Sequence, residues 1–268
     1  MQNIYTKEQI FSQLEEMNIP RNKVVLVHSS LRLVGSLEGG AQTLLDALIE
    51  YFTHDSGLLC IPTHTWNNLG KEITLDVSDH STCLGALPDL AAKDSRGIRS
   101  KNPTHSMAVF GDRARALEFI SDDEGVSSGT APGSCYGKLY RDGGYVVLIG
   151  VAHNRNTYLH CVDEMLRIPN RMSDGEISVG VKLESGEVVT RGFKLLYTDY
   201  TDDISKRFTK YETAFRYHKA ITDGFVGNAP TQVCDARIMK DVVEKIFKNV
   251  NGADPLADEF AIPPKWYC

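Results

Sequence analysis

The chain has 268 residues, of which 42% are hydrophobic, and its 29 basic and 35 acidic side chains give a formal net charge of −6. This length is enough for one large domain with a sizeable core. The acidic balance excludes the basic surface that binding to a nucleic-acid backbone requires, whereas it is compatible with a cationic substrate.

The distribution of apolar residues and cysteines predicts where the protein works. The N-terminus lacks a basic segment followed by an apolar run, and the longest apolar stretches are only long enough for strands. Six cysteines are scattered along the chain without a CxxC pair. We therefore expect a cytoplasmic protein with reduced thiols and no membrane partner.

Strands and helices alternate in the first part of the chain. An amphipathic helix is predicted at residues 6–17, a buried strand at 23–28, a helix at 41–52 and a second strand at 57–62. This strand–loop–helix–strand unit is typical of an α/β sheet with a crossover helix. Residues 63–81 are predicted to form a long polar loop, and such loops are usually functional or mobile.

The alternation continues through the middle of the chain and then changes. The next predicted elements are a helix at 87–93, a strand at 106–110, a helix at 114–120, a turn entering a helix at 133–139, a strand at 145–149 and a helix at 157–167. Residues 176–183 and 188–194 alternate in polarity on either side of a turn, which predicts a β-hairpin. Helices at 208–220 and 235–247, with a turn at 224–228 between them, complete the pattern.

These elements predict a single domain over residues 1–268. Its fold class is α/β (α+β), with a mixed central sheet flanked by helices. A small antiparallel β region is inserted at about residues 173–191.

The first segment with chemical potential follows the strand at 23–28. The loop that begins at His28 leads to paired glycines and a helix, so it offers free backbone N–H groups and the positive end of a helix dipole. Those features suit a phosphate, and Ser29, Ser30 and Arg32 add donors. The segment matches neither the dinucleotide nor the P-loop fingerprint, which leaves an ordinary strand-to-helix connection as the alternative.

The helix at 157–167 carries the strongest candidate for a general base. Asp163 and Glu164 follow His160 by three and four positions, so both are expected to lie near its ring. A neighbouring carboxylate orients an imidazole and raises its basicity, as a general base near neutral pH requires. A solvated pair on the helix surface is the alternative.

The remaining histidines are scattered. His105 stands in a Pro-Thr-His-Ser corner before a strand, where it can act as a base, a ligand or a structural staple. No two histidines have the helical spacing of a zinc site, and no metal site is predicted.

Together these segments resemble the aminoglycoside 3-N-acetyltransferase family. The resemblance runs from about residue 24 to residue 247. The motifs that carry it are Val27-His28-Ser29-Ser30-Leu31, the stretch from Gly35 to Gly40, Arg99-Ser100-Lys101-Asn102-Pro103-Thr104-His105-Ser106, Pro132-Gly133-Ser134-Cys135-Tyr136-Gly137-Lys138-Leu139, Leu148-Ile149-Gly150-Val151, Asn156-Thr157-Tyr158-Leu159-His160 and Val226-Gly227-Asn228-Ala229.

The resemblance implies an acyltransferase that moves the acetyl group of acetyl-CoA directly to a small-molecule amine, and a fold other than the common GNAT fold. The acceptor is implied to be an aminoglycoside, at the 3-amino group of 2-deoxystreptamine, which would make the protein an antibiotic-resistance enzyme. His160 is implied to be the base, with Asp163 or Glu164 as its partner. The family turn often has proline where this chain has Cys135, which argues against a cysteine acyl-enzyme.

The resemblance also implies two sets of binding residues. The cofactor set is His28, Ser29, Ser30, Leu31, Arg32, Val34, Gly35, Gly39, Gly40, Ser106, Ser134 and Tyr136. The acceptor set comprises His64 and His105 with the acidic residues that a polycation would need, namely Asp199, Asp202 and Glu212. The alternatives are acetylation of a different amine, a metal-dependent hydrolase and a non-catalytic CoA-binding protein.

Overall fold

A seven-stranded mixed sheet forms the centre of the computed structural model, which describes residues 4–268. In spatial order its strands are β11 (Ile221–Val226), β12 (Ala229–Asp235), β8 (Tyr145–Ile149), β2 (Val24–Ser29), β4 (Leu58–Pro62), β7 (Met107–Phe110) and β6 (Ile98–Arg99). β2 is parallel to both β4 and β8, whereas the outer strands pair antiparallel. The carboxyl ends of three strands therefore meet at one edge.

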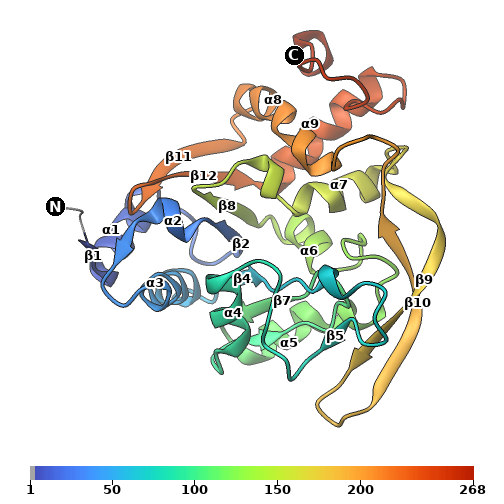
Figure 1. The fold of residues 1–268 in the computed structure, drawn as a ribbon. Helices are drawn as coiled ribbons and strands as arrows, with labels where there is room; N and C mark the ends of the chain where they lie inside the picture. Colours follow the sequence, from blue (N-terminus) through green and yellow to red (C-terminus); the bar gives the residue numbers. More distant parts are fainter. Residues whose placement is uncertain (1–3) are drawn as a thin grey trace.

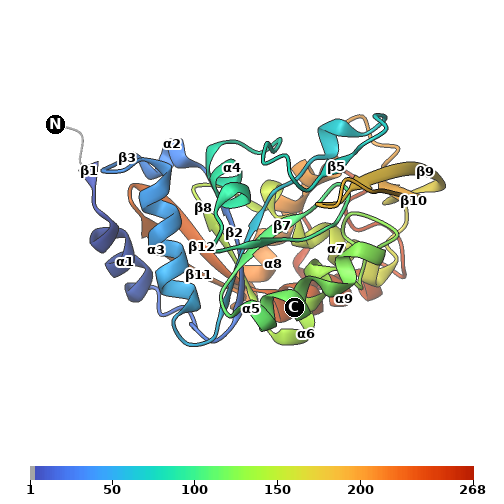
Figure 2. The ribbon, with the colours of Figure 1, turned by 90° about the horizontal axis from the view of Figure 1, so that it is seen from below.

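Helices cover both faces of this sheet (Figures 1 and 2). One layer contains α1 (Lys7–Glu16), α3 (Ala41–Thr53) and α4 (Ala86–Lys93), and the other contains α5 (Arg113–Ile120), α6 (Cys135–Asp142), α7 (Tyr158–Leu166), α8 (Glu212–Tyr217) and α9 (Ala236–Asn249). In β2, Val24 and Leu26 pack against the second layer, while Val25 and Val27 pack against the first. Successive strand residues point to opposite faces, so a strand buried on both sides must be apolar throughout.

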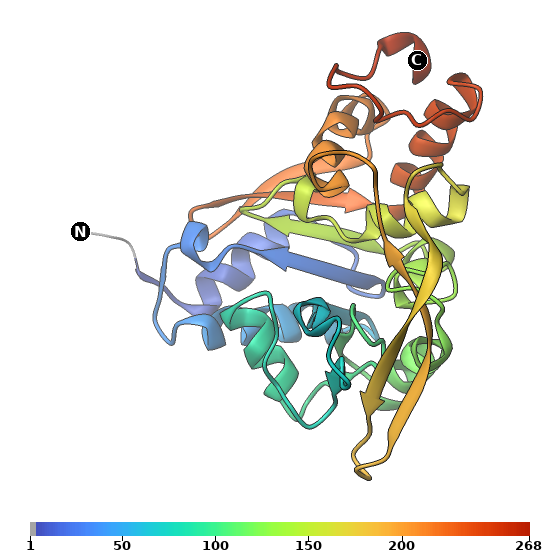
Figure 3. The ribbon, with the colours of Figure 1, turned by 45° about the vertical axis from the view of Figure 1, so that its right-hand side comes forward.

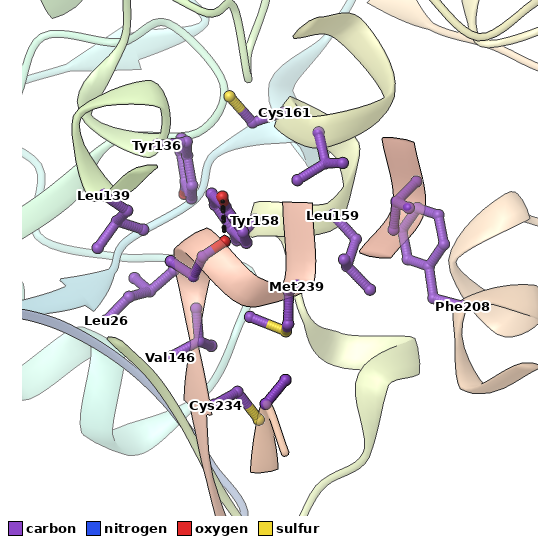
Figure 4. Close-up of a cluster of buried hydrophobic side chains, with 14 of the residues drawn as sticks. Leu26, Tyr136, Leu139, Val146, Tyr158, Leu159, Cys161, Phe208, Cys234 and Met239 are labelled. Carbon is purple, nitrogen blue, oxygen red and sulfur yellow. Dashed lines mark hydrogen bonds between the residues drawn. The ribbon is translucent and has the colours of Figure 1, made fainter. Parts of the chain in front are cut away.

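The packing beneath α7 fixes the position of that helix (Figure 4). Tyr158 and Leu159 are buried there against Met239 of α9 and Phe208. The Tyr158 hydroxyl donates a hydrogen bond of 2.8 Å to the carbonyl oxygen of Ala236, which satisfies its polar atom inside the core. The start of α7 is thus held rigidly against α9.

A long hairpin lies beside the main sheet (Figure 3). It consists of β9 (Met172–Lys182) and β10 (Val188–Leu196), and the short strand β5 (Leu75–Asp76) pairs with β9 in parallel. The mixed sheet, the flanking helices and this antiparallel hairpin confirm the predicted fold class. The remaining elements are β1 (Ile4–Tyr5), β3 (Ser36–Leu37), α2 (Leu31–Val34) and the 3₁₀ helices η1 (Trp66–Asn68), η2 (Ser121–Gly125), η3 (His153–Arg155), η4 (Ile204–Tyr211) and η5 (Pro264–Trp266).

Two predicted elements have other bounds in the structure, where the turn is confined to residues 227–228 and the helical region is divided in two. Residues 224–228 were expected to form a turn, but most of them belong to the β11–β12 hairpin, in which Phe225 pairs with Pro230. The helix predicted at 208–220 is instead the end of η4 followed by α8, and it stops before residue 218. Strand pairing with β8 overrides the local turn signals of glycine and proline.

Candidate functional site

A cavity of about 1080 Å³ opens where the carboxyl ends of β2, β4 and β8 meet. Its walls come from the segments around residues 27–33, 61–69, 83–88, 150–160 and 193–205. In open sheets of this kind, ligands bind outside the carboxyl ends of parallel strands. The cavity is also larger than most pockets for small ligands, so it has room for more than one bound molecule.

Four histidine rings gather at this cavity, although they are far apart in the sequence. They are His28, His64, His105 and His160. The ring centroids of His64 and His105 are 4.5 Å apart, and Nε2 of His64 shares a hydrogen bond of 2.8 Å with the hydroxyl of Tyr136. Nε2 of His28 is buried and has no hydrogen-bond partner within the described residues. A ligand in the cavity can form a hydrogen bond with this buried, unpartnered nitrogen.

Burial sets the protonation state of these rings. It lowers the pKa of His28 and His105 to about 3 and the pKa of His160 to about 4. Burial also lowers the pKa of His64, and the neighbouring histidines lower it further. All four imidazoles are therefore neutral at pH 7 and can accept a proton.

His160 does not contact the two carboxylates expected beside it. Its ring packs edge-on against Phe208, with centroids 4.8 Å apart. Asp163 instead accepts a hydrogen bond of 2.6 Å from Arg171. Glu164 accepts hydrogen bonds from the hydroxyl groups of Ser128 and Thr130, and none of these three residues lines the cavity. The expected pairing is thus corrected, because stronger partners hold both carboxylates.

The carboxylate that shares the cavity with His160 is Asp203. After burial, the charge of Asp203 is the largest influence on the pKa of His160, and it acts to raise that pKa. The Asp203 side chain accepts a hydrogen bond of 2.9 Å from the backbone N–H of Ser205, which caps the start of η4. This role of Asp203 is not visible in the sequence, because no local pattern brings residue 203 to residue 160.

The three acidic residues expected to bind the acceptor do not line the cavity. Asp199 accepts a hydrogen bond of 2.7 Å from the hydroxyl of Tyr197. Asp202 pairs with Arg207, and Glu212 pairs with Arg216 on the surface of α8. His64 and His105 do line the cavity, as expected.

The structure divides the expected cofactor residues into two groups. Those that line the cavity are His28, Ser29, Ser30, Leu31 and Arg32. Those that do not are Val34, Gly35, Gly39, Gly40, Ser106, Ser134 and Tyr136. The loop directly after β2 thus lines the cavity, whereas the remainder of the expected set lies outside it.

The residues outside the cavity have structural contacts instead. Val34 is fully buried in the core, and Ser106 donates a hydrogen bond of 2.8 Å to the carbonyl oxygen of Thr63. Ser134 caps α6 by accepting a hydrogen bond from the backbone N–H of Tyr136, whose own hydroxyl reaches His64. Tyr136 is thus one residue removed from the cavity.

Gly35 ends α2, and Gly40 begins α3. Gly35 has a φ of +94°, and a Cβ there would lie 2.6 Å from the side chain of Asn228. Gly40 has a φ of +62°, which a residue with a side chain rarely adopts. Conformation and space explain glycine at these positions without a bound phosphate.

Several cavity residues were not expected from the sequence. They include Arg155, Trp66, Leu84 and Tyr197. Arg155 follows the buried strand β8 by a few residues, the position at which α/β folds place binding groups, so this signal could have been used.

Within residues 4–268, no group of three or more histidine, cysteine, aspartate or glutamate side chains is arranged to hold a metal ion. Every helix in that range is too short or too polar to cross a lipid bilayer.

Comparison with known proteins identifies similar chains. Residues 26–248 match the family model described as aminoglycoside 3-N-acetyltransferase. The chain is 27% identical to aminoglycoside N(3)-acetyltransferase IV from a Salmonella species, and the match covers 99% of this chain and 94% of that protein. It is 24% identical to the aminoglycoside N(3')-acetyltransferase-like protein YokD of Bacillus subtilis, over 91% of this chain and 93% of that protein.

Solved structures of related proteins have the same fold. Aminoglycoside acetyltransferase AAC(3)-IVa, solved as a histidine-to-alanine variant in complex with a gentamicin, superposes with a TM-score of 0.76 at 25% identity, covering 92% of this chain and 90% of that one. AAC-IIIb, solved with CoASH, has a TM-score of 0.77 at 20% identity and covers 94% and 99%. These likenesses confirm the expected fold.

Proposed function

The chain belongs to the aminoglycoside 3-N-acetyltransferase family, and from this premise we propose that it transfers the acetyl group of acetyl-CoA directly to a primary amine bound beside His160. The observation that supports the proposal most strongly is the position of the His160 ring. It lines a large cavity together with Asp203 and the loop that follows β2. A proton acceptor is thus placed where two substrates can meet.

The residues of the cavity fit acetyl-CoA. Arg32 and Arg155 are exposed at its edge, and neither has a carboxylate partner within residues 4–268, so both are free to pair with phosphates. His28 offers its unpartnered Nε2 deeper in the cavity. Acetyl-CoA supplies the thioester, and the amine nitrogen attacks its carbonyl carbon.

His160 serves as the general base in this proposal. Its ring is neutral at pH 7 because burial lowers its pKa to about 4. As the new C–N bond forms, the nitrogen becomes acidic, so a weak base is sufficient to remove its proton. His160 accepts this proton and returns it to the sulfur as the C–S bond breaks. General-base catalysis of this kind contributes about 10²–10⁴-fold in rate.

Direct transfer is favoured over an acyl-enzyme because the cysteines are poor nucleophiles. Burial raises the pKa of the Cys135 and Cys161 thiols well above the usual value, and both are buried away from the cavity. Cys83 does line the cavity, but burial raises its pKa too, and its Sγ donates a hydrogen bond of 3.2 Å to the carbonyl oxygen of His64. A thiol in this state attacks a thioester slowly.

The family name supplies an aminoglycoside 3-amino group as the first acceptor to test. The cavity itself requires only an amine that reaches His160 while the thioester is bound. The acceptor panel must therefore contain aminoglycosides and simpler amines.

The test of the proposal is thiol release from acetyl-CoA with tobramycin, tyramine and tryptamine as acceptors, for the parent and for His160→Ala. The variant is expected to lose about 10²–10⁴-fold in kcat, with little change in KM for acetyl-CoA. His54→Ala is the matched control, because His54 is exposed and pairs only with Asp55. Activity of His160→Ala within tenfold of the parent would remove this ring from the mechanism.

A further inference from the structure

The charged side chains that line the cavity are few. Within residues 4–268 they are Arg32, Arg155 and Asp203. The cavity thus has two fixed positive charges and one fixed negative charge. Its histidines supply no negative charge.

Two nearby carboxylates are held by other groups. Glu164 accepts hydrogen bonds of 2.5 Å from both Ser128 and Thr130. Asp89 accepts one of 2.8 Å from the backbone N–H of Thr82. Neither carboxylate lines the cavity.

This charge balance is unfavourable for a polycation. An ammonium group that leaves water needs a carboxylate or several hydrogen-bond acceptors in exchange. Because Arg32 and Arg155 are assigned to the phosphates of CoA, an acceptor with four or five ammonium groups would find only the Asp203 carboxylate among the charged groups that line the described cavity. The net negative charge of the whole chain does not remove the cost of taking these ammonium groups out of water, because an ammonium group inside the cavity is stabilised by its immediate neighbours.

Part of the cavity wall is apolar and accessible. Trp66, Leu84 and Tyr197 are 46%, 40% and 50% exposed, and each lines the cavity. They come from η1, from the segment before α4 and from the end of β10, so three separate parts of the chain build one surface. Phe193 extends it toward the interior. Exposed apolar side chains gathered at a cavity mark a binding surface.

We infer that the acceptor is a primary amine with a single positive charge attached to an aromatic or aliphatic body, rather than a polycationic aminoglycoside. This inference rests on the proposed acetyl transfer and narrows its substrate. Asp203 pairs with the one ammonium group beside His160, and the body lies on the wall of Trp66, Leu84 and Tyr197.

The proton balance is complete with these groups. The ammonium releases one proton to solvent near Asp203 and becomes a nucleophile. The neutral nitrogen forms the amide bond, and its second departing proton passes through His160 to the thiolate. The products are the N-acetylated amine and CoA, and no further reactant is needed.

The experiment compares tryptamine and tyramine with tobramycin and gentamicin, by kcat/KM and by calorimetric binding in the presence of CoA. Tryptamine is expected to exceed tobramycin at least about tenfold in kcat/KM. Trp66→Ala is expected to raise KM for tryptamine more than it lowers kcat. Phe225→Ala is the matched control, since Phe225 is an exposed aromatic residue outside the cavity.

Two further variants test the charge argument. Asp203→Asn is expected to weaken tryptamine binding, whereas Asp241→Asn, on the exposed surface of α9, is expected to leave it unchanged. Leu84→Glu places a second carboxylate in the wall and is expected to improve tobramycin binding relative to tryptamine.

The outcomes separate this inference from the proposed function. Efficient acetylation of tobramycin with poor acetylation of tryptamine would overturn the inference and leave acetyl transfer intact. If no amine is acetylated, the proposed function fails and the binding data decide the inference alone. Tighter binding of tobramycin than of tryptamine would then overturn it, and the reverse order would support it.

Discussion

Asp163 and Arg171 form a buried ion pair in which Oδ2 of the carboxylate accepts a hydrogen bond of 2.6 Å from Nε of the guanidinium. Arg171 also donates to both oxygens of Asp254, and Asp254 accepts a further hydrogen bond from the hydroxyl of Tyr200. Burial would lower the pKa of Arg171, but the two aspartates raise it above its usual value, so the guanidinium stays charged. The network joins α7 to the C-terminal segment and to the loop before Asp203.

Removing one member of this network is expected to destabilise the fold. In Asp163→Ala, Arg171 keeps Asp254 but loses its most buried partner, and the expected loss is about 3 kcal/mol in the free energy of unfolding. Urea denaturation measures this loss. Glu118→Ala, an exposed change on α5, is the control. A change below about 0.5 kcal/mol for Asp163→Ala would show that the pair contributes little.

Gly129 is expected to be sensitive to a single added methyl group. A Cβ at this position would lie 2.1 Å from Nδ1 of His105 and 2.8 Å from Oγ1 of Thr104, which share a hydrogen bond of 2.7 Å. Gly129→Ala should therefore displace the His105 ring in the cavity, lower kcat/KM by tenfold or more and cost about 1–3 kcal/mol in stability. Gly125→Ala meets no atom within 4 Å and should behave as the parent in the same assays.

The two arginines at the cavity edge are expected to recognise the phosphates of CoA. Arg32→Ala and Arg155→Ala should raise KM for acetyl-CoA but not for acetyl-pantetheine, which lacks the nucleotide phosphates. Steady-state kinetics with both donors measure the difference. Arg113→Ala, on the exposed start of α5, controls for the loss of a surface charge. Equal effects on both donors would contradict phosphate recognition.

Acidification is expected to destabilise the protein through its buried histidines. Burial lowers the pKa of His28 to about 3 and that of His153 to about 4, below the usual value of 6.5. Between pH 6.5 and these lower values the unfolded chain binds more protons, so the free energy of unfolding falls as the pH falls. Each ring contributes up to about 1.4 kcal/mol per pH unit in that range.

Thermal or urea unfolding at pH 7, 6 and 5 measures this slope. His153→Asn removes one titrating ring and should make the slope shallower, whatever its effect on stability at pH 7. If the pH dependence of the free energy of unfolding is the same in the variant, His153 binds its proton in the folded state as readily as in the unfolded chain.

The apolar pattern was sufficient to predict the central strands. β2, β4 and β8 are buried on both faces, so nearly every residue in them must be apolar, and such a run is visible in the sequence. β12 was missed because Pro230 and the glycine at position 227 are local turn signals. Its pairing with β8 depends on residues about 80 positions away, which no local pattern contains.

The amino-acid sequence by itself determined the alternation of buried strands and amphipathic helices, and it placed His28 and His160 after strands whose ends meet. Burial and helical periodicity are local properties, so they can be read along the chain. Only the tertiary structure decided which carboxylate shares the cavity with His160. Asp163 is close in sequence, but Arg171 binds it more strongly inside the core, and Asp203 reaches the cavity because long-range packing of η4 carries it there.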